Sequence, residues 1–376
     1  MKDRIIGLIV NPLAGVGGKL GFKGSDGAYG IRALMMGADL VAPRRARVFL
    51  ESLDNELAGK GMEVRLLLPP GRMGESVARE AGRLRAVKVE AVPCVDPRIW
   101  PTTAHDTIRC ARTIENEVDL LVFAGGDGTA RDILNAVDMR LPVLGIPSGV
   151  KVYSGVFAVN PRSAARVVTA FLEGRVRLEE RPVVDVDEEE FRRDRLVLRT
   201  FGKLLVPVAE GVVESTKTLA GGEGLEDIAR FFAEELYRDC TLYILGPGRT
   251  VARIAEYLGV RKTLLGVDAV HNKKLVGKDL DEKAIIELIE KHPRTVIVLS
   301  PIGGQGFILG RGNQQLSPRV VRKVGKEGIV VVSDPEKLRS LGRLRVDTGD
   351  DDVDRMMRGY IRVLIGYGKW KMVRIE

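Results

Sequence analysis

The feature that most constrains this chain is the alternation of short apolar runs with segments of helical periodicity. The runs "RIIGLIV" (4–10), "DLLVFA" (119–124) and "LPVLGIP" (141–147) are continuously apolar, as in strands buried on both faces of a parallel sheet. Segments 42–61 and 129–139 have helical spacing. The sequence therefore predicts an α/β fold whose N-terminal part is a doubly wound, Rossmann-like parallel sheet. Such sheets bind ligands at the carboxyl ends of their strands.

The pattern changes after residue 174, where short strands separated by charged turns predict an antiparallel meander. Strands and helices then alternate again up to a terminal hairpin, which is expected to turn near residues 366–368. We therefore place a domain boundary near residue 175. The N-terminal domain (1–175) contains the Rossmann-like sheet. The C-terminal domain (176–376) is expected to be a mixed α/β, strand-rich unit that completes the ligand-binding crevice.

Charge and composition argue against several classes of protein. The formal net charge of +8 favours anionic partners. Aromatic residues make up only 5% of the 376 residues and are not interleaved with basic ones, so we expect no nucleic-acid partner. The lack of a long apolar segment predicts no membrane association. Small-molecule nucleotides are the expected partners, and a homo-oligomer, either a dimer or a tetramer, is expected.

The cysteines are few and scattered. Cys94, Cys110 and Cys240 lie far apart in the sequence, and we expect from them neither a disulfide framework nor a zinc signature. This usage favours a reducing compartment, and the expected localisation is cytoplasmic.

The stretch "GGDGT" (125–129) directly follows one of the buried runs. A structural interpretation explains its glycines by a tight strand-to-helix turn, and Thr129 with Asp132 by a capping box. It leaves Asp127 without a packing role. A functional interpretation places phosphate oxygens against the glycine backbone and the start of the next helix, with Asp127 facing a reacting hydroxyl. We favour the functional interpretation because the loop stands between a buried strand and a helix.

GGDGT resembles the signature shared by NAD kinases and by the diacylglycerol and sphingosine kinases, one superfamily of phosphoryl-transfer enzymes. "IVNPLAGVGGK" (9–19) is similar to the opening loop of the lipid kinases, and "LGIPSGVKVYSGVFA" (144–158) to a loop of NAD kinases. "VIVLSPIGGQGFILGRGNQQLSP" (296–318) resembles their Thr-Pro-x-Gly-Ser loop and the segment after it. Over nearly all its length the chain resembles the prokaryotic ATP-NAD kinase-like proteins.

This resemblance implies a phosphotransferase that phosphorylates the 2′-hydroxyl of NAD to give NADP, using Mg²⁺ and either ATP or polyphosphate. Asp127 would be the catalytic base that accepts the hydroxyl proton. No residue is assigned as a metal ligand. For Asn11 a turn-forming role, and for Lys151 a solvated loop position, remain open alternatives. The candidates for nucleotide or phosphate binding are Asn11, Gly15, Gly125, Gly126, Gly128, Thr129, Ser148, Gly149, Lys151, Gly248, Arg249, Gly303, Gly304 and Gln305.

The chain also departs from NAD kinases. It has no convincing copy of their Asn-Glu pair, and Gln305 stands where their loop carries a hydroxyl. The loop "GPGRT" (246–250) is additional, and is either a second anion site in which Arg249 pairs with phosphate or a tight turn. In "RVDTGDDDVD", Asp347 and Asp350 are second-line candidates for Mg²⁺, and the favoured interpretation of this run is a helix cap.

Two other functions are compatible with the sequence. One is a kinase of the same superfamily that acts on another small hydroxyl acceptor, such as a sugar, a polyol or a lipid. The other is a sensor that binds NAD or ATP without turnover.

Overall fold

The computed structural model describes residues 4–22, 28–149, 152–186, 197–209 and 224–376. They divide into two compact units. The first contains the described residues of segments 1–17, 24–187 and 197–214, and the second contains those of 18–23, 188–196 and 215–376. Candidate residue Lys151 lies outside the described residues.

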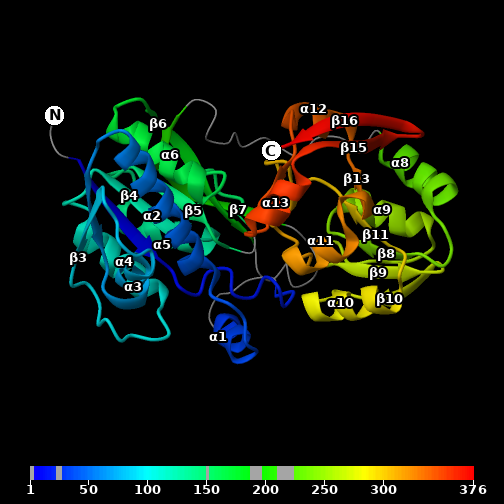
Figure 1. The fold of residues 1–376 in the computed structure, drawn as a ribbon, viewed down its shortest axis with the longest axis horizontal. Helices are drawn as coiled ribbons and strands as arrows, with labels where there is room; N and C mark the ends of the chain where they lie inside the picture. Colours follow the sequence, from blue (N-terminus) through cyan, green and yellow to red (C-terminus); the bar gives the residue numbers. More distant parts are fainter. Residues whose placement is uncertain (1–3, 23–27, 150–151, 187–196, 210–223) are drawn as a thin grey trace. The chain divides into compact units, whose positions relative to one another are not determined.

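The first unit is built on a five-stranded parallel sheet with the order β3-β2-β1-β4-β5 (Figure 1). Every residue of β4 and β5 is buried, and so is all of β1 except its first residue. This burial on both faces explains the continuous apolar runs in the sequence. The strands are β1 (Ile5–Val10), β2 (Val64–Leu68), β3 (Val87–Ala91), β4 (Leu120–Gly125) and β5 (Val143–Pro147).

Helices cover both faces of this sheet, as predicted. Helices α2 and α6 pack together on one face, and α4 and α5 pack together on the other. The helices of this unit are α1 (Ala28–Met35), α2 (Val41–Gly59), α3 (Glu75–Glu80), α4 (Ala104–Ile114), α5 (Asp127–Val137) and α6 (Pro161–Leu172). The predicted doubly wound α/β architecture is therefore confirmed for the N-terminal part of the chain.

The meander predicted after residue 174 is a long antiparallel hairpin of β6 (Arg177–Val186) and β7 (Leu198–Val208). Two of the short strands expected there form one continuous strand, β7. Val183, Leu204 and Val206 are fully buried in the core of the first unit, so the hairpin packs on α5 and β5.

The second unit is a seven-stranded mixed sheet with the order β10-β9-β8-β11-β13-β15-β16, which confirms the predicted mixed α/β class. Strands β8, β11, β13 and β15 run parallel, and the sheet is antiparallel at both ends. The strands are β8 (Leu242–Leu245), β9 (Asp268–His271), β10 (Lys274–Gly277), β11 (Thr295–Leu299), β13 (Ile329–Val332), β15 (Gly359–Gly366) and β16 (Lys369–Ile375). A separate two-stranded sheet pairs β12 (Phe307–Leu309) with β14 (Arg345–Val346). The hairpin of β15 and β16 is the predicted one.

Two hydrophobic cores lie in the second unit, one on each face of its sheet. Successive residues of β8 point to opposite faces of the sheet, since Ile244 belongs to one core and Leu245 to the other. The first core packs against α10 and α11, and the second against α8 and α9. The helices are α8 (Leu225–Phe231), α9 (Arg249–Tyr257), α10 (Glu282–Lys291), α11 (Pro318–Val324), α12 (Pro335–Leu341) and α13 (Asp351–Met357).

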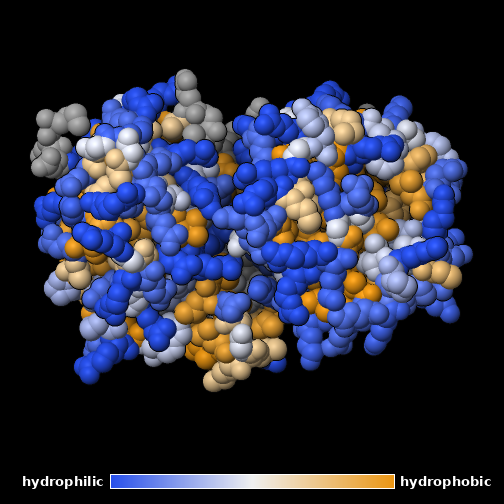
Figure 2. Space-filling view, in the orientation of Figure 1, coloured by the Kyte–Doolittle hydropathy of each residue, from blue (hydrophilic) through white to orange (hydrophobic). Residues whose placement is uncertain are grey.

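Much of the surface seen in Figure 2 is hydrophilic, with an apolar group of residues over α1. Ile31, Met35 and Met36 are exposed there. Within the described ranges no helix is both long enough and apolar enough to cross a membrane.

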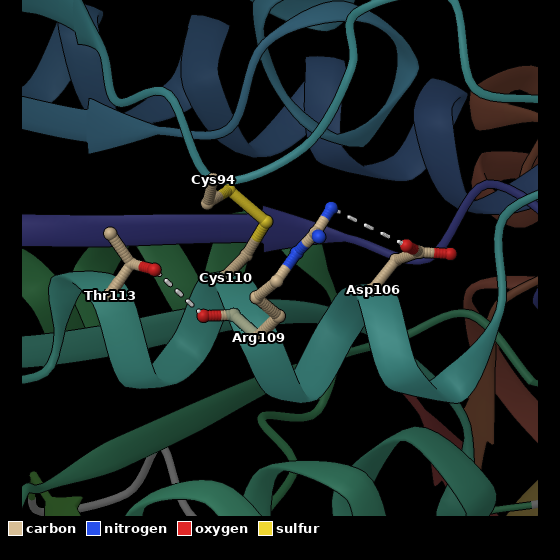
Figure 3. The surroundings of a disulfide bond; sticks show 5 residues. All are labelled: Cys94, Asp106, Arg109, Cys110 and Thr113. Atoms are coloured by element: carbon tan, nitrogen blue, oxygen red, sulfur yellow. Dashed lines mark hydrogen bonds and ion pairs between the residues drawn. A yellow bond between two sulfur atoms is a disulfide. The ribbon is translucent and has the colours of Figure 1, made fainter.

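A disulfide joins Cys94 and Cys110, contrary to the expectation that the cysteines would stay unpaired (Figure 3). Cys94 lies in the loop after β3, and that loop runs back over α4, where Cys110 is fully buried. The two Cα atoms are 5.0 Å apart, within the range that a disulfide spans. Sequence spacing could not show this, because the packing of the loop on the helix brings the sulfur atoms together. Cys240 is free and exposed, and the cytoplasmic localisation loses the support of unpaired cysteines and stays a prediction.

Candidate active site

The candidate site of the first unit lies where β1, β4 and β5 end. These strands run parallel and adjacent, so their carboxyl ends share one edge of the sheet. The strand order reverses between β1 and β4, and such a switch point is the usual place for a ligand in an open α/β sheet. Asn11 and Gly15 follow β1, GGDGT spans the end of β4 and the start of α5, and Ser148 follows β5.

The loop after β1 is fixed to the GGDGT segment by Asn11. The Asn11 backbone N–H donates to the carbonyl of Ala124 (3.0 Å), and its Nδ2 donates to Oγ1 of Thr129 (3.0 Å). Its Oδ1 accepts from the N–H of Leu13 (3.1 Å). The turn-forming alternative for Asn11 is therefore present in the structure, and the same side chain also holds the start of α5.

Gly15 brings the loops after β1 and β5 into contact. Its φ is +83°, and a Cβ at this position would stand 2.0 Å from the carbonyl oxygen of Ser148. Any side chain would therefore push the two loops apart. The Ser148 and Gly149 N–H groups donate to the Gly125 carbonyl at 2.8 and 3.2 Å. The structure thus brings these predicted residues together around the end of β4.

Gly15→Ala should destabilise the protein by about 3 kcal/mol or more, because the new Cβ overlaps a backbone atom in addition to its unfavourable φ. Gly37→Ala is a matched control, since Gly37 has a φ of +81° and nothing within 4 Å of the added Cβ. Gly37→Ala should lower the free energy of unfolding by only about 1 kcal/mol. Chemical denaturation of both variants measures the difference, and equal losses would contradict the close approach of the two loops.

The predicted capping box of Thr129 and Asp132 is wrong. Helix α5 begins at Asp127, with Gly126 as its N-cap, so Thr129 lies within the first turn. Its side chain is 3% exposed and would be 2.4–2.6 Å from a Cβ on Gly125. Gly125 is therefore required by the packing of Thr129. The sequence spacing matched a capping box because the helix start was placed two residues too late.

Asp127 stands at the first position of α5 and is 5% exposed. Its Oδ2 accepts from the N–H of Tyr153 (2.7 Å), and its Oδ1 accepts from the N–H of Ser154 (2.9 Å). The carboxylate thus links the helix start to the segment after the third loop. The sequence alone indicated no structural role for Asp127.

Burial raises the pKa of Asp127 from its ordinary value of 3.8 to about 7. Hydrogen bonds from Ser154 and Tyr153 oppose the rise, and the charge of Asp185 adds to it. Asp185 itself pairs with Arg131 of α5 at 3.0 Å. A carboxyl group with a pKa near neutrality is matched to accept a proton from a substrate hydroxyl. Tyr153, Ser154 and Asp185 were not predicted as site residues, because only the tertiary fold places them beside Asp127. Arg131 was not predicted either, because its role comes from the ion pair with Asp185.

The remaining candidates lie in the second unit. Gly248 is the N-cap of α9 and Arg249 is its first residue. Gly303 has a φ of +60° and open space around it. Gln305 is engaged within the unit, because its side-chain oxygen accepts from Arg311 and its carbonyl accepts from Arg345.

The two second-line magnesium candidates are occupied by other contacts. Asp347 is 8% exposed and lies 3.8 Å from the Arg311 guanidinium. Asp350 accepts the N–H groups of Asp352 and Val353 as the N-cap of α13, which is the favoured cap interpretation. It also pairs with Arg322 at 2.7 Å.

The parallel sheet and its switch point, with a buried carboxylate at the start of α5, define a Rossmann-like α/β protein. Comparison with protein families makes this more specific. The ATP-NAD kinase N-terminal domain matches residues 6–176, and the ATP-NAD kinase C-terminal domain matches residues 238–375. The chain therefore belongs to the ATP-NAD kinase family and is a kinase of that family. A search of curated proteins finds no match.

Proposed function

We propose that this protein transfers a phosphoryl group from ATP to the 2′-hydroxyl of NAD, giving NADP. The observation that carries the proposal is Asp127, a buried carboxyl group whose pKa is near 7 at the switch point of a parallel sheet. The family membership supports a nucleotide substrate and donor. Polyphosphate is an alternative donor.

In this reaction Asp127 accepts the proton of the 2′-hydroxyl while the hydroxyl oxygen forms a bond to the γ-phosphorus of ATP. The bond between that phosphorus and the bridging oxygen breaks, and ADP leaves with the electron pair. The N–H groups of Tyr153 and Ser154 keep the carboxylate oriented. The first N–H groups of a helix have no partner within it, so we assign those of α5 as donors for phosphate oxygens.

Mg²⁺ fits the proposed reaction as an ion that arrives with the nucleotide. In the part of the chain that the structure describes, no group of three or more His, Cys, Asp or Glu side chains is placed to hold a metal ion. Mg²⁺ is commonly bound through substrate phosphates with only one or two carboxylates from the protein. When bound, the ion would neutralise charge on the phosphates.

An acceptor screen separates this proposal from the two alternatives. ADP release would be measured with NAD, sugars, polyols and diacylglycerol as acceptors, each with Mg²⁺ and ATP. The proposal expects ADP release with NAD. Release only with another acceptor would favour the kinase of a different alcohol. A ligand-dependent rise in the melting temperature without any ADP would favour the sensor.

The raised pKa of Asp127 also predicts how stability depends on pH. Between pH 4 and pH 7 the unfolded chain has lost this proton while the native protein keeps it, so stability falls as the pH rises. Asp127→Asn removes this titration. The unfolding free energy of the variant minus that of the wild type should therefore increase between pH 5 and pH 8, by roughly 2–3 kcal/mol.

Urea denaturation at several pH values measures this difference. Asp138→Asn is the control, since Asp138 is exposed at the end of the same helix and its difference from the wild type should stay constant. A pH-independent difference for Asp127→Asn would contradict the pKa shift.

A further inference from the structure

A second strand edge, within the second unit, has the features of an anion site. Strands β8, β11 and β13 are parallel neighbours, so the loops that follow them meet at one edge of the sheet. These loops begin at Gly246, Ser300 and Ser333. None of their residues takes part in the chemistry proposed for Asp127.

The loop after β8 requires glycine where it approaches the loop after β11. Gly248 has a φ of +114°, and a Cβ there would be 2.8 Å from Oγ of Ser300. Ser300 in turn donates to the carbonyl of Pro247 (3.4 Å). Gly248 is also the N-cap of the nine-residue helix α9 and offers no side chain to its first N–H groups. These donors therefore remain available to a ligand at this edge.

Two cationic side chains stand at the same edge. Arg249, the first residue of α9, is exposed and has no hydrogen-bond or ion-pair partner among the residues that the structure describes. Lys337 of α12 donates from Nζ to the carbonyl of Pro301, in the loop after β11. Burial lowers the pKa of Lys337, the charge of Arg249 lowers it further, and Asp334 opposes the change. Both cations border the loop after β11, because Arg249 follows Gly248, which closely approaches Ser300, and Lys337 contacts Pro301. An anion between the two cations would relieve their mutual repulsion.

The loop after β13 adds an acceptor that has no donor. Asp334 is 4% exposed, and its Oδ1 accepts the N–H groups of Glu336 and Lys337 at 2.8 and 3.2 Å. Its Oδ2 is buried without a hydrogen-bond partner in the described structure. A buried carboxylate oxygen without a donor is costly, and a hydroxyl of a ligand would supply one.

We propose that this edge binds a phosphate ester that also carries hydroxyl groups. Its phosphate lies on the first N–H groups of α9, between Arg249 and Lys337, and one of its hydroxyls donates to Oδ2 of Asp334. A nucleotide and a sugar phosphate share this chemistry. The proposal goes beyond phosphorylation of NAD, and it stands or fails independently of Asp127.

Isothermal titration of the full-length protein with ribose 5-phosphate, ADP and inorganic phosphate tests this site. We expect Arg249→Met and Lys337→Met each to weaken the binding of ribose 5-phosphate at least about tenfold, because each removes a charged hydrogen bond. Arg339→Met, at an exposed position of α12, is the control and should leave the affinity unchanged. Unchanged affinity in both test variants would overturn the proposal.

Asp334→Asn tests the hydroxyl contact. It should weaken the binding of ribose 5-phosphate more than the binding of inorganic phosphate, because only the ester carries alcohol hydroxyls. An equal effect on both probes, or no effect on either, would overturn this contact. If the protein binds ADP more tightly than ribose 5-phosphate, and Arg249→Met loses this ADP binding, the ligand is a nucleotide. If it binds both with equal affinity, the ligand is a sugar phosphate.

Hydrogen exchange of the unmodified protein gives a result that does not depend on the folding of variants. Ribose 5-phosphate should slow exchange of the N–H groups of residues 249–251, which form the first turn of α9. No protection at this turn at a saturating concentration would overturn the proposal. The same sample can be assayed for NADP formation, so a failure here is distinguishable from a failure of the proposed reaction.

Discussion

Asp127→Asn should lower the rate of NADP formation by a factor of about 10² to 10⁴, the usual contribution of a general base. The amide has nearly the size of the carboxyl group but cannot accept the proton of the 2′-hydroxyl. One of the two hydrogen bonds from Tyr153 and Ser154 would also be lost, because an amide nitrogen cannot accept it. The effect should therefore fall mainly on kcat.

The control for this variant is Asp138→Asn, the same change at the exposed end of α5. Asparagine has nearly the size of aspartate and Asp138 is exposed, so this variant should retain the wild-type rate. The wild-type rate should rise with pH up to about 7 and then level off, because the base must be ionised. Full turnover in Asp127→Asn would rule out the proposed base.

Removal of the disulfide should cost about 3 kcal/mol of the free energy of unfolding. The bond links Cys94 and Cys110, which are 16 residues apart, and a loop of about 15 residues corresponds to about 3 kcal/mol in the chain-entropy account. It ties the loop after β3 to α4, whose packing with α5 supports the GGDGT segment. The double variant Cys94→Ala/Cys110→Ala should lose this stabilisation.

Denaturation with and without a reductant measures the contribution of the disulfide. The reductant should destabilise the wild type and leave the double variant unaffected. Cys240→Ser is the control, because Cys240 is free and exposed, and this variant should respond to the reductant as the wild type does. If unfolded protein without reductant shows three reactive thiols in place of one, the disulfide does not form.

The fold class was predictable because parallel strands buried on both faces leave continuous apolar runs, as in β4. The loops at the strand ends were predictable for a related reason, since glycine is required where backbones approach closely, as at Gly15. The first residues of the helices were harder to predict. Thr103 and Asp106 form the capping box of α4, whereas Thr129 has the same spacing and lies inside α5.

The electrostatic partners of the site could not be predicted. Tyr153 and Ser154 hold Asp127 through backbone N–H groups, which every residue except proline possesses and which therefore leave no mark in the sequence. The pKa of Asp127 depends on burial, a property of the complete tertiary structure. The disulfide likewise depends on how a loop packs on a helix. The oligomeric state stays a prediction.

The most direct test of the account is the product formed from NAD, ATP and Mg²⁺ by the purified protein. NADP would be read out with an NADP-specific dehydrogenase, and the position of the new phosphate by phosphorus NMR. We expect NADP phosphorylated at the 2′-hydroxyl, with ADP formed in equal amount by the wild type and almost none by Asp127→Asn. ADP release without NADP, or equal NADP from both proteins, would contradict it.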